Sequence, residues 1–435
     1  MIKPDCFYGL LALLLICSCK EESIPEVFQP SFAYEAYIHS LEQTKLLDSE
    51  LGEQFVQASD AALTNPIPIT TPYQEHFYFQ AESPKAYGFQ FEGLRGEKVS
   101  IEIKPPAVEK GRLFIDLFRL DDESNIGMTY IASATENSYQ LAFEPRNTHR
   151  YLLRVQAELL HSGNYTLTIV NKSSYDFPVS GGKNHDIGSF FGDPRDGGRR
   201  KHHGIDIFAR KHTPIVSPAN GTVRFAGEKG LGGRVVWLRD VRYERALYFA
   251  HLESIYVETG DEVAIGDTIG TVGNTGNART TPPHLHFGIY ESGPIDPYDF
   301  VANQRPRLKE INVDDRLVGT LARVNSNLTK TIWPQDTLVK ISKHQVVKIE
   351  SAGYQTYRAR MPNGSYISIS SRHLEPLNPI ETKSLTGTFF AKSDSSSIVL
   401  GRLKSPETFD ILGFNQNYQL VRNNDFQGWV TTYSP

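Results

Sequence analysis

The stretch TTPPHLHFGIY, residues 280–290, places two histidines one residue apart, between a proline pair and an apolar, aromatic run. Residues i and i+2 of a β-strand point to the same face, so a strand here would present both imidazoles on one side. The backbones of His284 and His286 would then lie roughly 6–7 Å apart. That spacing lets one metal ion meet both rings, or lets one ring bind the ion while the other reaches its water. The pair predicts a strand at a functional site. Whether both rings bind the metal ion, or only one does, must be decided from other parts of the chain.

A second group lies upstream, in RRKHHGIDIFA, residues 199–209. His202 and Asp206 stand four residues apart, which is roughly 13 Å on a straight strand and too far for a shared metal ion. Gly204 can supply the bend that would bring them together, in a turn leading into a strand. A spacing of this kind is common by chance, so this group alone predicts little.

A third group is ALYFAHLESI, residues 246–255, in which His251 ends an apolar run. Such a histidine is more often structural than catalytic. The combination is more specific than any one group, because a hydrolytic zinc site needs three ligands with an open position, a base and a group that stabilises the oxyanion. The chain has 13 histidines, and those between residues 185 and 286 are His185, His202, His203, His212, His251, His284 and His286.

The whole chain has 435 residues, a length that predicts roughly three domains. Its formal net charge of −5 argues against a nucleic-acid partner, as does the lack of a basic cluster with interleaved aromatic residues.

The N-terminus reads MIKPDCFYGLLALLLICSCKEE. Its apolar run, residues 7–17, is short for a membrane span and predicts a signal peptide. The sequence Ile16-Cys17-Ser18-Cys19 resembles a bacterial lipobox, which implies cleavage before Cys19 and a lipid on its sulfur; a general secretory signal is the alternative. All three cysteines lie in this segment, so the mature chain has no disulfide. The following Lys-Glu-Glu resembles a short surface-export signal of some lipoproteins, or is a solvated charge run.

The rest of the chain predicts a mainly β, multidomain protein. Near-helical apolar spacing follows the tether, with Gly52 expected to divide two helices. Alternating apolar residues then predict a β-sandwich whose last strand, SGNYTLTIV, resembles that of bacterial pre-peptidase domains. A weak repeat, 349–369 and 411–432, resembles a pair of Src-homology-three-like barrels, or is a plain β extension. The expected segments are a signal peptide 1–18, a tether 19–33, helices 34–66, a sandwich 70–171, a histidine-rich domain 180–303, and barrels 316–378 and 384–435.

Three stretches together resemble the lysostaphin/LytM-type zinc endopeptidases that cut peptidoglycan cross-links. They are FFGDPRDGGRRKHHGIDIFA, YFAHL and GTVGNTGNARTTPPHLHFGIY. The resemblance covers about residues 180–303 and implies an antiparallel β fold with a duplicated hybrid motif. It implies one Zn²⁺, held by His202, Asp206 and His286. His284 would activate the zinc-bound water, and His251 would stabilise the oxyanion or shuttle a proton. Spacing alone does not separate the roles of His284 and His286.

The resulting hypothesis is a zinc endopeptidase that hydrolyses peptidoglycan stem-peptide cross-links. A non-catalytic regulator of other wall hydrolases and a wall-binding scaffold are the alternatives; a D,D-dipeptidase explains fewer of the motifs. The lipobox places the chain on the outer membrane of a Gram-negative bacterium through Cys19, facing the periplasm or the cell surface. The sequence gives no indication of the oligomeric state.

Overall fold

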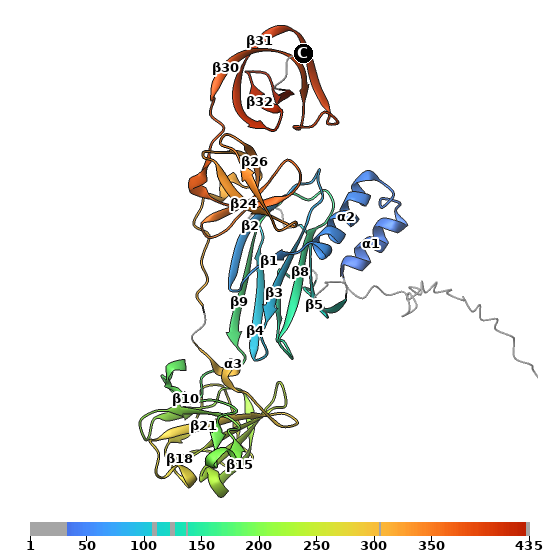
Figure 1. Ribbon diagram of the computed structural model, residues 1–435. Coiled ribbons are helices and arrows are strands. Elements are labelled where there is room, and N and C mark those ends of the chain that lie inside the picture. Colours follow the sequence, from blue (N-terminus) through green and yellow to red (C-terminus); the bar gives the residue numbers. More distant parts are fainter. Residues whose placement is uncertain (1–32, 107–110, 122–126, 136–137, 304–305, 432–435) are drawn as a thin grey trace, which may run out of the picture.

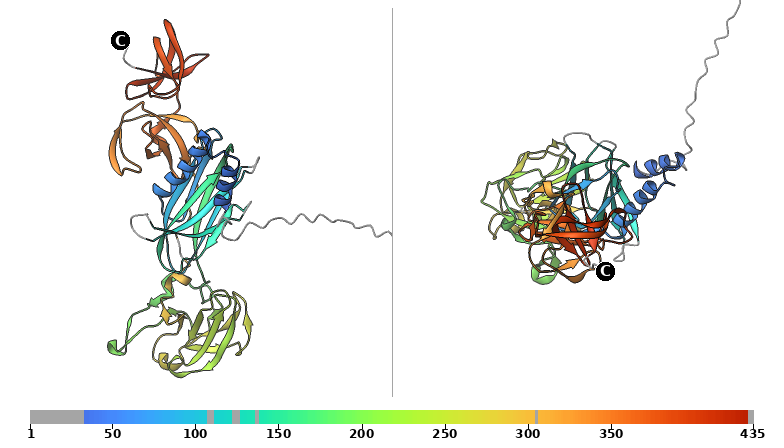
Figure 2. Two further views of the ribbon diagram at one scale, coloured as in Figure 1. Left: turned by 90° about the vertical axis from the view of Figure 1, so that its right-hand side faces the viewer. Right: turned by 90° about the horizontal axis from the view of Figure 1, so that it is seen from above.

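The computed structural model describes residues 33–106, 111–121, 127–135, 138–303 and 306–431. The predicted signal peptide, Cys19 and nearly all of the predicted tether lie outside these ranges. The predicted mainly β fold is confirmed: four β bodies follow one another along a single long axis (Figures 1 and 2). A search of the described helices finds none that is long and apolar enough to cross a membrane.

Two helices, α1 (Ala33–Gln43) and α2 (Glu50–Thr64), lie against the outer face of the sandwich (Figure 1). The helix break predicted at Gly52 is wrong, because Gly52 lies in the first turn of α2. The chain turns at residues 44–49 instead, where the Ser49 hydroxyl caps α2 by accepting a hydrogen bond from the Gly52 N–H at 3.1 Å. A Cβ at Gly52 would lie 2.2 Å from the Leu46 carbonyl oxygen, so glycine here permits a tight turn rather than a broken helix.

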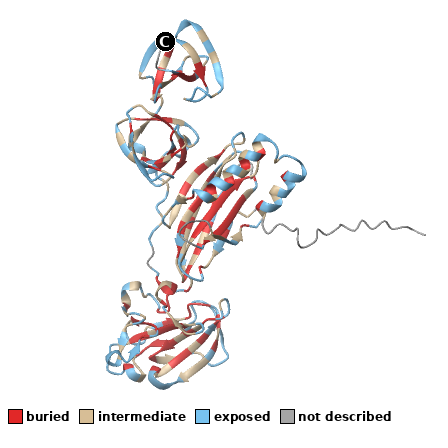
Figure 3. Cartoon of the chain, turned by 45° about the vertical axis from the view of Figure 1, so that its right-hand side comes forward, coloured by how far each residue is buried: buried red, intermediate tan, exposed pale blue. Residues whose placement is uncertain are grey.

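The sandwich consists of two sheets, antiparallel except where β1 pairs parallel with β3, and their inner faces carry the predicted alternating apolar residues. Ile101, Leu117, Leu153 and Leu167, one from each predicted strand, are all buried. Figure 3 shows buried segments running along the strands of the sandwich. The strands are β1 (Ile67–Pro68), β2 (Tyr73–Phe79), β3 (Ala86–Gly93), β4 (Glu97–Lys104), β5 (Leu113–Leu120), β6 (Met128–Ser133), β7 (Gln140–Phe143), β8 (His149–Ala157) and β9 (Gly163–Ser173).

The histidine-rich region forms an eight-stranded sheet, ordered β10-β13-β21-β17-β16-β15-β19 with β22 beside β21, and a three-stranded sheet, β14-β20-β18. Its elements are β10 (Ile187–Ser189), β11 (Pro194–Arg195), β12 (Arg200–Lys201), β13 (Ile205–Phe208), β14 (Pro214–Val216), β15 (Gly221–Glu228), β16 (Arg234–Asp240), β17 (Ala246–Ala250), β18 (Leu252–Ile255), β19 (Glu262–Val263), β20 (Thr268–Val272), β21 (His284–Tyr290), β22 (Pro294–Ile295) and α3 (Tyr298–Val301).

This region docks on one end of the sandwich through α3. A Cβ at Gly96 would lie 2.9 Å from both the ring and the backbone nitrogen of Phe300, so only glycine permits the close approach there. The Tyr175 N–H donates to the Phe300 carbonyl at 2.9 Å, and Arg95 pairs with Glu291 at 2.8 Å. The histidine-rich region and the sandwich are therefore joined by buried and charged contacts rather than by a free linker.

The C-terminal part returns to the opposite end of the sandwich (Figures 1 and 2). Strand β2 pairs with β26, so one nine-stranded sheet runs from the sandwich into the next body. The last body is a closed barrel of four strands. The strands are β23 (Leu321–Val324), β24 (Leu328–Ile332), β25 (Thr337–Ile341), β26 (Val346–Ala352), β27 (Thr356–Arg360), β28 (Tyr366–Ser370), β29 (Leu374–Glu375), β30 (Glu381–Phe390), β31 (Val399–Asn415), β32 (Tyr418–Arg422) and β33 (Gln427–Thr431).

One buried arginine ties both helices to the sandwich. The Arg154 guanidinium donates to Asp116 Oδ2 at 2.5 and 3.2 Å and to the Ser59 hydroxyl of α2 at 2.7 Å. Its carbon lies 3.7 Å from the centre of the Tyr34 ring of α1. The Arg154 and Asp116 side chains are only 3% and 1% exposed, so neither charge has water as an alternative partner.

We therefore predict that Arg154→Ala destabilises the sandwich by about 3–5 kcal/mol, because it leaves the Asp116 carboxylate buried and unpaired. Urea unfolding followed by circular dichroism measures the loss. The matched control is Arg119→Ala in the same sheet. The partner of Arg119, Asp121, is 38% exposed. That exposed pair is expected to contribute about 0–1 kcal/mol. Equal unfolding midpoints for the two variants would contradict this account of the helix attachment.

Candidate metal centre

Three neighbouring strands, β13, β21 and β17, position the site. In the antiparallel register of β13 and β21, Asp206 lies opposite His286 and Phe208 lies opposite His284. On the other side of β21, Ala250 of β17 lies opposite His286. His251 directly follows β17. The three histidine groups of the sequence therefore meet on adjacent strands.

The bend predicted at Gly204 is present. A Cβ at Gly204 would lie 2.4 Å from the Phe287 carbonyl oxygen and 2.9 Å from His286 Nε2, so the backbone passes directly against β21. Only a residue without a side chain allows this approach. As a result the side chain of His202, just before the bend, turns back to within 3.0 Å of Asp206.

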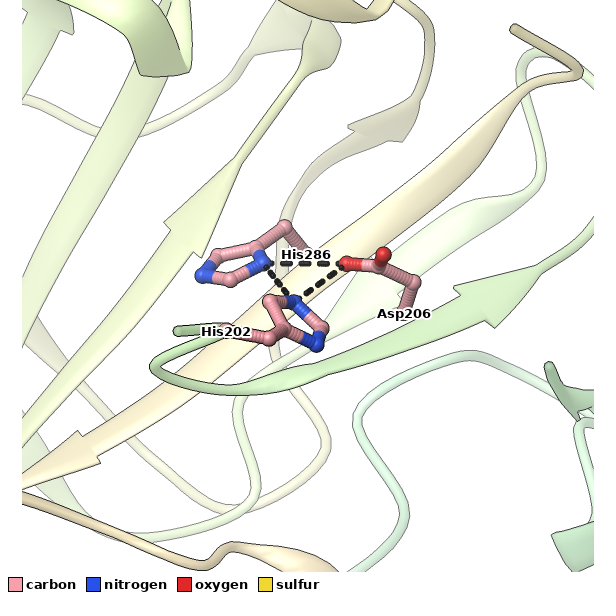
Figure 4. A group of neighbouring side chains, drawn as sticks. All are labelled: His202, Asp206 and His286. Atoms are coloured by element: carbon pink, nitrogen blue, oxygen red, sulfur yellow. Dashed lines mark hydrogen bonds and ion pairs between the residues drawn. The ribbon is translucent and has the colours of Figure 1, made fainter. Parts of the chain in front are cut away.

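Three ligand-type atoms converge beside this bend (Figure 4). His202 Nε2 lies 2.9 Å from His286 Nδ1 and 3.0 Å from Asp206 Oδ1, and His286 Nδ1 lies 2.9 Å from the same oxygen. Around a tetrahedral zinc ion with bonds of about 2.0–2.1 Å, ligand atoms stand about 3.3 Å apart. Two imidazole nitrogens and one carboxylate oxygen are a donor set that zinc prefers. The cluster therefore fits one such ion after a small outward movement of each side chain.

A second set of contacts orients these three side chains. His202 Nδ1 donates to the Phe190 carbonyl at 2.8 Å, which leaves the lone pair of Nε2 facing the cluster. Arg195 donates to Asp206 Oδ2 at 2.7 Å and to the Ser189 hydroxyl at 2.7 Å. The sequence analysis did not identify Arg195. Its position on β11, eleven residues before Asp206, gives no periodic signal of this contact.

The charges of the cluster are strongly coupled. Burial disfavours the Asp206 carboxylate, but hydrogen bonds from His202 and His286, together with their charges, outweigh burial and hold the pKa of Asp206 well below its ordinary range. Burial lowers the pKa of His286, against the hydrogen bond and charge of Asp206. Both directions favour a carboxylate and a neutral imidazole, the forms that bind a metal ion.

His251 and His284 form a second pair beside the cluster, with ring centres 5.0 Å apart. His251 Nδ1 donates to the Thr275 carbonyl and His284 Nδ1 to the Pro282 carbonyl, each at 2.9 Å. Each ring therefore has its Nε2 free to accept a proton. Burial, with the nearby charges of His284 and His286, lowers the pKa of His251 to about 4.

The backbone of His251 has a φ of +66°, an uncommon conformation for any residue other than glycine. Its N–H donates to the Gly232 carbonyl at 2.8 Å, which holds this turn in place. Strained backbone of this kind is concentrated at functional sites. His203, in contrast, is exposed and packs near Phe191, and the cluster found in the structure does not include it.

The two histidine pairs open into a cavity of about 810 Å³. Tyr248, Tyr290 and Leu231 contribute to its walls. The charged residues among its described lining are the acid Asp206, already within the cluster, and the bases Arg195, Arg199, Arg200 and Lys201. The described lining of the cavity thus carries more positive than negative charge.

The comparisons with known proteins agree on this part of the chain. Residues 200–297 match the model of peptidase family M23. An "L-Ala--D-Glu endopeptidase" of Bacillus subtilis is 35% identical over 142 residues, which are 30% of this chain and 43% of that protein. A "DD-carboxypeptidase/endopeptidase Mpg" of Neisseria meningitidis is 39% identical over 112 residues, which are 26% of this chain and 25% of that protein.

Among solved structures, the catalytic domain of lysostaphin from Staphylococcus simulans is 30% identical. It covers 27% of this chain and 93% of its own, with a TM-score of 0.25 that supports no further argument. The chain spans less than half the length of these curated relatives, so their activities belong to them. What the sequence match establishes is that residues 200–297 form a domain of peptidase family M23.

Proposed function

We propose that the chain is a zinc-dependent endopeptidase that hydrolyses the peptide cross-links of peptidoglycan. The observation that carries the proposal is the convergence of His202, Asp206 and His286 on one point beside the His251–His284 pair, in an open cavity. Both relatives described above are named as endopeptidases, which supports the same reaction class. A regulator without catalysis would not need all five side chains in this geometry.

Each protein group then has a part in the reaction. His202, Asp206 and His286 would hold the ion, which when bound would act as a Lewis acid and lower the pKa of a water to about 7. His284, with Nδ1 engaged by Pro282, presents Nε2 to take a proton from the attacking water. His251 is neutral near pH 7, because its pKa is lowered to about 4, and its free Nε2 accepts a proton. Its place beside His284 suits His251 to stabilise the oxyanion or to shuttle a proton.

We also propose that a lipid on Cys19 attaches the chain to the outer membrane of a Gram-negative bacterium, on its periplasmic or outer side. The lipobox-like sequence Ile16-Cys17-Ser18-Cys19 supports this. Lipidation at that position would leave thirteen residues between Cys19 and Ala33, where α1 begins.

The first prediction concerns metal binding. His202→Ala and Asp206→Ala should each lower zinc affinity by about 100-fold or more, because two protein ligands do not replace three. His284→Ala should retain one zinc per chain. Zinc content after dialysis, measured by inductively coupled plasma mass spectrometry, tests this. His203→Ala is the matched control, an exposed histidine adjacent to His202. Full zinc occupancy in both ligand variants would refute the ligand assignment.

The second prediction concerns the reaction. The soluble chain starting at Lys20 should convert cross-linked muropeptide dimers of purified peptidoglycan to monomers, and mass spectrometry should identify the bond cut. Zinc-loaded His284→Ala should be slower by about 10²–10⁴-fold, the usual contribution of a general base. An unchanged profile with zinc-loaded wild-type chain would reject the endopeptidase proposal. Equal rates for wild type and His284→Ala would reject the role of His284 alone.

The third prediction concerns substrate charge. Arg200 pairs with Asp196 at 2.5 Å, whereas Arg199 and Lys201 have no carboxylate partner among the described residues. A double variant, Arg199→Ala with Lys201→Ala, should raise KM for a cross-link with free carboxylates by about 3–10-fold and leave kcat unchanged, as expected for exposed ion pairs. Added salt should reduce the difference.

The control for this prediction is Lys211→Ala, a lysine paired with Glu253 outside the cavity lining. An amidated substrate provides a second control, since it removes the charges that the bases would meet. If the double variant raises KM equally for the amidated and the free substrate, Arg199 and Lys201 do not select for substrate charge.

A further inference from the structure

A second cavity lies at the other end of the sandwich, where β2 meets β26. It has a volume of about 610 Å³. Three parts of the chain line it: the start of the sandwich (residues 67–75), the returning connection (306–309), and the first C-terminal body (331–368). The two pairs His76↔Ala352 and Phe77↔Ser351 join the sheets beside it. This volume falls within the range of small-molecule and peptide pockets.

Hydrogen bonds hold the walls in place. The Ile311 N–H donates to Gln74 Oε1 at 3.1 Å, which attaches the returning connection to the sandwich. The Asn312 N–H donates to the Tyr354 carbonyl at 2.9 Å, which attaches the same connection to the first C-terminal body. Trp333 and Tyr366 exchange two backbone hydrogen bonds at 2.8 and 2.9 Å. The cavity is therefore preformed, and a ligand would not have to order it.

The lining is aromatic and positively charged. Its aromatic members are Tyr73, Trp333, Tyr354 and Tyr366, and its bases are Arg307, Lys309 and Arg358. The one acid of the described lining is Glu75, which already accepts hydrogen bonds from Ser351 and, at 3.2 Å, from Arg358. Lys309 Nζ lies 5.7 Å from the centre of the Tyr354 ring, at the surface of the cavity. Within the described lining, Arg307 and Lys309 thus have no acidic partner.

Arg358 provides an independent observation. Its side chain is 10% exposed, and only Nη2 has a partner, Glu75. Nε and Nη1 are buried without a hydrogen-bond partner in the described part of the chain. The guanidinium lies 5.2 and 5.9 Å from the ring centres of Tyr87 and Tyr366, which supply no strong acceptor. A buried guanidinium so poorly satisfied is stabilised by a further negative charge nearby.

We propose that this cavity binds a short peptide that carries free carboxylates, and that its occupant is an uncleaved stem peptide of peptidoglycan. The identification of the occupant as a stem peptide rests on the proposed function. The positive charge and the aromatic residues of the lining are observed independently of that function. Basic groups would pair with the carboxylates, and the aromatic faces would contact the aliphatic parts. A wall strand held here keeps a high local concentration of cross-links at the catalytic cavity across the sandwich.

Tryptophan signals can report on each cavity separately, because the chain has only three tryptophans. Trp333 lines this cavity, while the Trp237 ring centre lies 4.4 Å from that of Tyr248 in the wall of the catalytic cavity. The experiment titrates a synthetic, uncross-linked stem tetrapeptide into the zinc-loaded soluble chain carrying His284→Ala. The indole N–H signals are followed by nuclear magnetic resonance and assigned with Trp333→Phe.

We expect the Trp333 signal to move on saturable binding of the free tetrapeptide. Arg307→Ala with Lys309→Ala should weaken that binding by about tenfold, as two ion pairs would. These two residues are exposed, so the variant tests recognition without removing the buried Arg358. Lys343→Ala, an exposed lysine of the same body outside the lining, should leave it unchanged.

The inference is overturned if Trp333 does not move, if only Trp237 moves, or if the fully amidated tetrapeptide binds equally well. It is also overturned if peptide-free wall glycan strands move Trp333 as strongly, since the occupant would then be a sugar chain. Cross-link cleavage by the wild-type chain is measured separately. Cleavage without Trp333 binding rejects only this inference, and Trp333 binding without cleavage rejects only the proposed function.

Discussion

The antiparallel pairing of β13 with β21 is the contact on which the site depends. It sets Asp206 opposite His286, and a slip of β13 by one residue would turn Asp206 to the face of the sheet opposite to that of His286. The register is fixed by buried residues of the same strands, such as Ile207 and Phe287. The close passage of Gly204 over β21 then returns His202 to the same point. One packed strand pair therefore positions both core residues and the three candidate metal ligands.

The sandwich has a comparable role at larger scale, because it sets the positions of the other bodies. One end contacts α3 of the peptidase domain, and the opposite end extends its sheet into the first C-terminal body. These junctions contain buried backbone hydrogen bonds and charged pairs, which resist hinge motion more than an exposed linker does. The two cavities consequently lie beyond opposite ends of the sandwich.

Much of the site could be predicted from the sequence, because its residues lie in short motifs with recognisable spacing. The strand at residues 284–290 and the bend at Gly204 follow from two-residue alternation and from glycine's freedom. Arg195 was missed because its contact with Asp206 depends on a hairpin that no periodicity indicates. The continuous sheet was missed for a related reason: His76 and Ala352 pair across most of the chain. The helix break was misplaced because Gly52 lies inside the first turn of α2, where its missing side chain permits the close approach of the preceding turn at Leu46.

The most direct test of the account is the coordination of zinc in the loaded chain, measured by X-ray absorption at the zinc edge. The account predicts two imidazole nitrogens at about 2.0–2.1 Å, one carboxylate oxygen at about 2.0–2.2 Å, and one further light ligand outside the protein, in a four-coordinate arrangement. Replacing His202 by alanine should remove one imidazole from the spectrum. A site with three or four imidazoles, or one with no position left for a non-protein ligand, would contradict the assignment of His284 and His251 to proton transfer.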